Sequence, residues 1–297
     1  NIVVIDARGG MLEEGALMYD KAVVVDWTDI SLLDEFGGEN LGKLLSKDNY
    51  EQIFSKLGIN TNSEVLVYGF TMPEQGFGDE ARVVYTFNYA GFDKVKFIDG
   101  GFKQVEKLGF NKNYEPTKDR LDVSDVVRSE ATQNEKAIFT DELLSKLGSN
   151  DVQIIDTRLE VEFNGRVIYG ENKAGHIPGA ISLPFNSLVD KEGFVKSREE
   201  LEKLPGVGRK TANVVLSVGF NVPAIAVDTH VERVAKMFGL ADLNDSPLQV
   251  EKSLMSVFPM ESWGKIHHQL IHLGRYKLPA RGERSIDPEL EKLLVLK

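Results

Sequence analysis

The chain contains no cysteine among its 297 residues. This absence excludes disulfide bonds, thiolate metal sites, iron–sulfur clusters and cysteine nucleophiles. There is also no apolar run near the ~18 residues that a membrane-spanning helix needs, and no signal-peptide pattern. We therefore expect a cytoplasmic protein with no membrane partner. A chain of this length has room for two or three domains with sizeable cores.

Basic residues are scarce in most of the chain. The whole sequence has 35 Lys+Arg and 46 Asp+Glu, a net charge of −11. From Arg198 onward there are 14 basic and 13 acidic residues, so this part carries +1 and the preceding part −12. Phosphate contacts need local positive charge, whereas an acidic surface repels nucleic acid at long range. We therefore expect any phosphate-binding surface in the C-terminal part.

The first 110 residues alternate short β-branched runs with helical stretches. The expected strands are Ile2–Asp6, Ala22–Asp26, Val65–Gly69 and Val95–Ile98, with a helix over Glu80–Asn88. This rhythm predicts an α/β fold with a mostly parallel sheet flanked by helices. The following stretch, residues 111–136, is polar and poorly periodic, which is typical of a linker.

A second α/β unit follows over residues 137–196, with a helix expected at Asp141–Leu147 and a strand at Val152–Asp156. Its Ile155-Asp156-Thr157-Arg158 repeats Ile5-Asp6-Ala7-Arg8 of the first unit. The repeated pattern predicts a weak internal duplication.

The second unit resembles the rhodanese family of sulfurtransferases through Asp156-Thr157-Arg158 and the run AGHIPGA, residues 174–180. Residues 1–110 resemble the inactive first domain of tandem members, and residues 137–196 a truncated second domain. The family acts through a cysteine persulfide, so the missing cysteine excludes sulfur transfer. We therefore expect structural roles for Asp156, Arg158 and His176, as an ion pair and a hydrogen-bonded turn histidine.

Residues 197–297 are predicted to be all-α. A capping box of Ser197 and Glu200 opens a helix over Ser197–Leu204. Further helices are expected at Lys210–Val218, Thr229–Phe238, Pro247–Val257 and Trp263–Tyr276. The adjacent His267 and His268 point about 100° apart on such a helix, so we expect no metal there.

A glycine-containing hairpin lies between the first two of these helices, at Leu204-Pro205-Gly206-Val207-Gly208. Its glycines permit a positive φ and let backbone N–H groups approach a phosphate closely. Such contacts hold DNA without reading its bases. An ordinary helix–turn–helix is the alternative interpretation of a bare PGVG.

The flanks of this hairpin, LPGVGRKTA and VDTHVERV, resemble the endonuclease III family of DNA-repair glycosylases. The resemblance implies that Lys210 is the amine nucleophile and Asp228 the catalytic carboxylate; we also expect Asp228 to cap the helix that follows. We expect Arg209 to contact a phosphate or solvent. The implied partner of residues 197–297 is double-stranded DNA with abasic or damaged sites, and the implied contacts are Leu204, Pro205, Gly206, Val207, Gly208, Arg209 and Thr211.

Two features of the endonuclease III family are missing from the sequence. The cysteines of its iron–sulfur cluster align with Leu278, Ser285, Pro288 and Leu294, so we expect no cofactor. The family also has a long helical section upstream of the hairpin, which forms the opposite wall of its DNA cleft. Only residues from about 197 onward carry the resemblance.

The two resemblances make the chain a chimera of unrelated folds, natural or engineered, and leave three hypotheses open. The helical part acts as a DNA glycosylase and abasic-site lyase; or it binds DNA phosphates without catalysis; or it is an appendage on an inert rhodanese-like scaffold. Sequence alone does not decide whether the chain is an active enzyme. An exposed edge of the truncated sheet would favour self-association.

Overall fold

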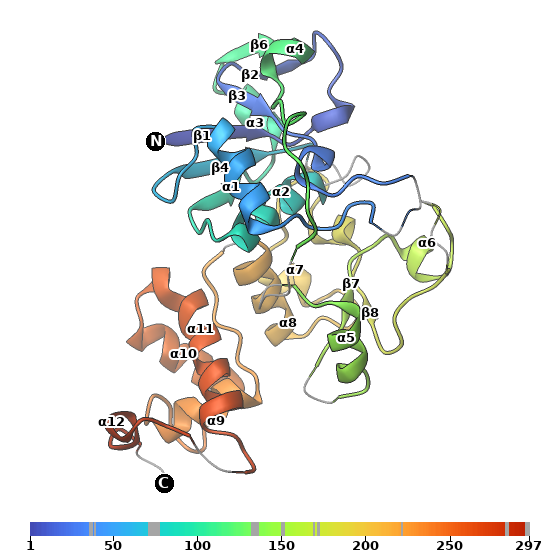
Figure 1. Ribbon diagram of the computed structural model, residues 1–297. Helices are drawn as coiled ribbons and strands as arrows, with labels where there is room; N and C mark the ends of the chain where they lie inside the picture. The colour runs from blue at the N-terminus through green and yellow to red at the C-terminus, as the bar shows by residue number, and fades with distance from the viewer. Residues whose placement is uncertain are drawn as a thin grey trace. The chain divides into compact units, whose positions relative to one another are not determined.

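A computed structural model describes residues 1–35, 38, 40–70, 78–131, 137–149, 152–168, 170, 173–220, 222–282 and 285–294. The chain divides into two compact units, Asn1–Lys196 and Ser197–Lys297. The first unit is α/β, and the described part of the second is helical (Figure 1).

The first unit is built on a parallel sheet in the order β3-β1-β4-β5, as expected for an α/β fold. Its strands are β1 (Ile2–Asp6), β3 (Ala22–Val24), β4 (Glu64–Tyr68) and β5 (Val95–Phe97). All four predicted strands are therefore confirmed, with ends that differ by at most two residues. Strands β1 and β3 are mainly apolar β-branched runs, as in a sheet buried on both faces, whereas Lys96 of β5 is exposed.

Helices α1 (Lys47–Lys56) and α2 (Gly78–Ala90) pack on this sheet. The rings of Phe54 and Phe87 stack with their centroids 3.8 Å apart and join the same core as Val65 and Val67. The helix predicted over Glu80–Asn88 is confirmed as the central part of α2.

The stretch predicted as a linker, residues 111–136, is part of the first unit over its described residues 111–131. Strand β6 (Asn111–Asn113) pairs antiparallel with β2 (Leu17–Tyr19), and helix α4 (Pro116–Asp119) follows. Three later apolar side chains then enter the core: Leu121, Val123 and Val126. The linker prediction is wrong here because these residues reach the core from irregular backbone, which a search for helix or strand periods does not detect. Residues 132–136 lie outside the described part.

The remaining short elements of the first unit are α3 (Phe102–Glu106), α5 (Thr140–Lys146), β7 (Ile155–Asp156), α6 (Glu160–Phe163) and β8 (Ile181–Ser182). Strands β7 and β8 pair in parallel over two residues each. The strand predicted over Val152–Asp156 is thus limited to its last two residues.

The repeated Asp-X-Arg pattern forms two equivalent ion pairs. Asp6 accepts hydrogen bonds from the backbone N, Nε and Nη2 of Arg8, at 3.1, 2.9 and 2.6 Å. Asp156 accepts the same three bonds from Arg158, at 3.1, 3.0 and 2.7 Å. The first arginine side chain is 5% exposed and the second 39%. The repeated turn therefore keeps its geometry, but less of the fold covers the second copy.

The second unit contains α7 (Arg198–Leu201), α8 (Arg209–Val214), α9 (Thr229–Met237), α10 (Pro247–Val257), α11 (Trp263–His272) and α12 (Pro288–Glu291). Helices α9, α10 and α11 lie together (Figure 1) and share a core that includes Val231, Val234, Val250, Leu254 and Leu270. One π-helical turn extends α8 over Val215–Gly219, and another extends α11 over Leu273–Lys277. The predicted helix ends at Val218 and Tyr276 fall within these turns.

Candidate nucleic-acid interface and lysine–aspartate site

The hairpin between α7 and α8 presents backbone to solvent while its apolar side chains anchor it. The capping box of Ser197 and Glu200 is formed, and Leu201 at the end of α7 is fully buried. Val207 is 6% exposed, and its backbone N–H donates to the Leu204 carbonyl at 3.0 Å. Gly206 has a φ of +74°, a conformation that costs L-residues about 1 kcal/mol.

The tip of the hairpin has free backbone donors. Pro205, Gly206 and Gly208 are exposed, and a Cβ atom on Gly208 would meet nothing within 4 Å. Within the described part of the chain, the N–H groups of Gly206 and Gly208 have no backbone acceptor. These amides can therefore approach a phosphate oxygen without side-chain obstruction.

Two residues predicted to contact DNA face the interior of the unit instead. The side chains of Val207 and Thr211 are buried, so only their backbone could meet a ligand. The sequence pattern could not separate these positions from the exposed ones, because the same hairpin both anchors itself and presents its tip.

Arg209 has a protein partner in place of the expected phosphate. Its Nε and Nη2 donate to the Glu251 carboxylate at 2.7 and 2.8 Å, and Arg198 Nη1 reaches the same carboxylate at 3.4 Å. The Glu251 side chain is 3% exposed. The hydrogen bonds to Glu251 raise the pKa of Arg209 above its ordinary value. This cluster ties α7 and α8 to α10, a role that sequence analysis missed because the residues lie more than 40 positions apart.

Lys210 is the next residue on α8, and its side chain is exposed. Among the described residues it has neither an ion pair nor a hydrogen-bonded partner for its amine. A lysine amine can form a Schiff base with a carbonyl substrate, and it attacks the carbonyl carbon in its neutral form.

Asp228 begins α9 as its N-cap. Its Oδ1 accepts hydrogen bonds from the backbone N–H groups of His230 and Val231, at 2.9 and 2.8 Å. The expected capping role is confirmed. Within the described residues Oδ2 has no hydrogen-bond partner. One carboxylate oxygen thus fixes the helix end, and the other is available to a substrate.

His267 links these two groups electrostatically. It is 2% exposed, and its Nδ1 donates to the Ala226 carbonyl at 2.7 Å. Burial lowers the pKa of His267 to about 4; the neighbouring His268 and Lys210 add to this lowering, and Asp228 opposes it. The charges of Lys210 and Asp228 therefore act on the same buried ring, in opposite directions. Sequence analysis treated this histidine only as a metal candidate; in the described residues, no group of three His, Cys, Asp or Glu side chains could hold a metal.

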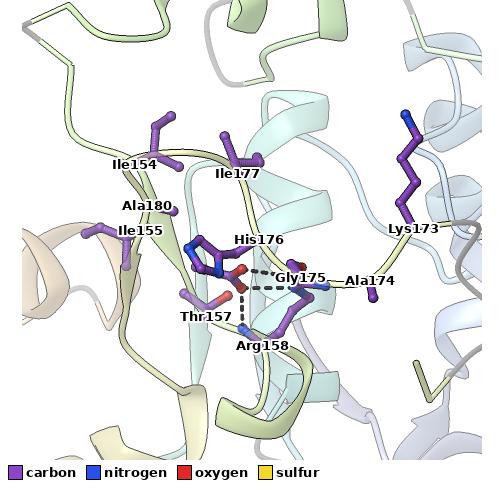
Figure 2. Close-up of a pocket in the computed structure, with 11 residues that line it drawn as sticks. Ile154, Ile155, Thr157, Arg158, Lys173, Ala174, Gly175, His176, Ile177 and Ala180 are labelled. Carbon is purple, nitrogen blue, oxygen red and sulfur yellow. Dashed lines mark hydrogen bonds and ion pairs between the residues drawn. The ribbon is translucent and has the colours of Figure 1, made fainter. Parts of the chain in front are cut away.

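The rhodanese-like residues line an open cavity of about 550 Å³ in the first unit (Figure 2). Arg158 is bonded to Asp156 and also donates to the Gly175 carbonyl at 2.8 Å, while Lys173 lies apart from them. The hydrogen bonds from Arg158 lower the pKa of Asp156. These contacts fix the turn, and the cavity has no cysteine nucleophile, since the chain contains no cysteine.

His176 lies in the same cavity (Figure 2). Its ring stacks on Phe163 at 3.6 Å between centroids, and its Nδ1 lies 2.8 Å from the Phe163 carbonyl oxygen. Its stacking face and one ring nitrogen are thus engaged by the protein.

The residues at the four cluster positions do not fit an iron–sulfur cluster. Leu278 is fully buried and Leu294 is 8% exposed, and both belong to a small apolar core with Met237. Ser285 donates its backbone N–H to the Lys277 carbonyl, and Pro288 opens α12. This donor set has no thiolate, and side-chain packing occupies two of its positions.

Comparisons with known proteins point in two directions. Residues 191–218 match the family described as helix-hairpin-helix motif, a match that begins six residues upstream of Ser197. The chain is 57% identical to endonuclease III of Bacillus subtilis over 98 residues, which is 33% of this chain and 45% of the relative. It is 34% identical to endonuclease III of Buchnera aphidicola over 167 residues, which is 52% of this chain and 77% of the relative. The latter alignment is longer than the second unit, so the similarity extends upstream of the boundary near residue 197 expected from sequence.

The likeness of the α/β part is one of fold. The crystal structure of YnjE superposes with a TM-score of 0.53 at 19% identity, covering 67% of this chain and 48% of that one. The α/β part has the rhodanese-like fold. The chain spans about half the length of the first endonuclease III relatives that it matches. No helix in the described residues is long and apolar enough to cross a membrane.

Proposed function

Because the chain belongs to the endonuclease III family, we propose that residues 197–297 form a DNA glycosylase and abasic-site lyase segment, carried by a rhodanese-like scaffold without sulfurtransferase activity. The observation that supports this most directly is that, among the described residues, the exposed amine of Lys210 and the Oδ2 atom of Asp228 have no protein partner.

The proposed chemistry begins with the Lys210 amine, which attacks C1′ of an abasic deoxyribose in its aldehyde form. Water leaves, and a C=N bond joins Nζ to C1′ as a protonated Schiff base. Loss of a C2′ proton then breaks the C3′–O bond, and the 3′ phosphate leaves by β-elimination. On a damaged nucleotide, the same attack would displace the base from C1′. The chemistry requires a nucleotide extruded from the duplex.

Asp228 has two tasks in this scheme. Oδ2 is free to accept a proton or to stabilise positive charge that develops on the sugar, because Oδ1 is held by the N–H groups of His230 and Val231. The N–H groups of Gly206 and Gly208 at the hairpin tip would hold a backbone phosphate and so position the sugar over Lys210.

Borohydride reduction tests the proposal, since it converts the Schiff base into a stable amine. Wild-type protein and Lys210→Ala are incubated with abasic-site duplex DNA, and covalent complexes are separated by denaturing electrophoresis. The proposal expects an adduct with wild type and at least a 100-fold loss with Lys210→Ala, about the size of a removed catalytic group. An adduct of equal yield with Lys210→Ala would refute it.

DNA binding without catalysis is the second candidate function, favoured by the open amides at the hairpin tip. It expects salt-dependent duplex binding that Gly206→Asp weakens and Lys210→Ala retains, and no adduct from either protein. Salt-independent binding would count against it.

A further inference from the structure

The segment that carries Asp228 is extended and buried, yet it belongs to no sheet. Ala224, Ile225 and Ala226 are at most 1% exposed and Val227 is 9% exposed. Within the described part of the chain, no backbone–backbone hydrogen bond involves residues 224–227. Buried backbone carbonyls need partners, so something else must fix this segment.

Two buried side chains supply those partners. Asn213 of α8 donates its Nδ2–H to the Ile225 carbonyl at 2.9 Å, and His267 of α11 donates its Nδ1–H to the Ala226 carbonyl at 2.7 Å. Their residues are 1% and 2% exposed. Consecutive carbonyls are thus held from two helices, which fixes both the position and the rotation of the chain at this point.

The placement of these donors connects the two proposed catalytic groups. Asn213 stands three residues after Lys210 on the same helix, α8. Ala226 stands two residues before Asp228. The clamp therefore joins the helix that carries the amine to the segment that carries the carboxylate.

The geometry points to Asn213 and His267 as positioning residues that set the placement of Asp228 against Lys210. This inference rests on the proposed lyase function. Neither residue need touch the substrate. A misplacement of about 1 Å between reacting groups can cost about 100-fold in rate, so a clamp of this kind acts on the chemical step more than on DNA binding.

His267 can hold this bond without introducing charge. Burial lowers its pKa to about 4, so near neutral pH the ring is neutral and uses its one N–H at Nδ1 for the Ala226 carbonyl. The next residue, His268, is exposed, and its ring centroid lies 5.1 Å from that of His267.

A single-turnover experiment on the full chain tests the inference. The rate constant of borohydride-trapped adduct formation at saturating abasic-site DNA and the Kd for the same DNA are measured for each variant. The informative pair is His267→Asn, whose amide nitrogen takes the place of Nδ1, and His267→Gln, whose amide nitrogen takes the place of Nε2. Gln269→Ala, at an exposed position of the same helix, is the matched control. Fluorescence of Trp263 in a Trp27→Phe background and the helical circular dichroism signal establish that each variant is folded.

The expected result is a rate constant about 10 to 100 times lower for His267→Gln, with Kd within about twofold of wild type. His267→Asn should remain within about fivefold of wild type, and Gln269→Ala should match wild type. Asn213→Leu, which removes the second donor, should lower the rate constant and leave Kd unchanged. Equal rates for the Asn and Gln variants, or losses confined to Kd, would overturn the clamp while leaving the lyase proposal intact. No wild-type adduct would overturn the lyase proposal, and the clamp with it.

Discussion

Arg209 and Lys210 are adjacent on α8, and the structure predicts opposite consequences for their removal. Replacing Arg209 by alanine leaves the Glu251 carboxylate, 3% exposed, without its two shortest hydrogen bonds. Breaking a buried ion pair typically costs 3–5 kcal/mol. Arg209 itself is 36% exposed and Arg198 stays near Glu251 at 3.4 Å, so the expected loss is smaller, about 2–3 kcal/mol. Lys210→Ala removes an exposed, unpartnered side chain and should change stability by less than about 0.5 kcal/mol.

Urea unfolding of the helical unit measures this difference. The chain has two tryptophans, Trp27 in the first unit and Trp263 in the second, so a Trp27→Phe background leaves Trp263 as the reporter. The double variant Arg209→Met with Glu251→Leu is the matched control, because an apolar pair removes the orphaned charge and should recover most of the lost stability. Unchanged unfolding of Arg209→Ala, together with a reduced salt dependence of DNA binding, would refute the assignment and restore Arg209 as a phosphate contact.

Three further predictions follow from the same unit. Leu278→Ala, at a fully buried position, should lower the free energy of unfolding by about 2–5 kcal/mol. The control Leu243→Ala, at an exposed position, should change it by less than about 0.5 kcal/mol. Equal effects of the two variants would show that no apolar core forms around Leu278. Gly206→Ala should cost about 1 kcal/mol from its positive φ alone, while Gly208→Ala, with open space around the new Cβ, should cost less in the same unfolding assay. Burial lowers the pKa of His267 to about 4 in the folded protein, below the 6.5 of the unfolded chain, so the unfolded chain binds more protons between these pH values. The contribution of His267 to the free energy of unfolding should therefore be fully present above pH 6.5 and fall by about 3 kcal/mol as the pH drops to 4. The variant His267→Asn should remove this component from the dependence of stability on pH.

The sequence predicts the elements of this chain well where a period or a cap defines them. The α10 helix runs from Pro247 to Val257 as expected, because Ser246 and Gln249 cap it and proline opens it. Strand β1 matches Ile2–Asp6 for a similar reason, since a continuous apolar run suits a central parallel strand. Residues 111–131 could not be predicted in this way, because their core side chains come from irregular backbone.

The sequence predicts the two proposed catalytic residues of the candidate site but not the residues that hold them in place. The resemblance around LPGVGRKTA and VDTH proposes Lys210 and Asp228, and capping chemistry predicts the bonds that Asp228 makes to α9. The partners that hold the site together are separated widely along the chain: Glu251 lies 42 residues from Arg209, and His267 lies 41 residues from Ala226. Such pairs depend on how helices pack, and a pattern read along one chain does not contain that information.

Mapping the reduced adduct by peptide mass spectrometry would test the central claim most directly. The full chain is trapped with abasic-site DNA and borohydride, digested, and the modified lysine is identified. The account predicts modification of Lys210 and loss of the adduct in Lys210→Ala, with Lys203→Ala, an exposed lysine before the same hairpin, unaffected. Modification of Lys203 or of the N-terminal amine instead, or no adduct from folded wild-type protein, would contradict it.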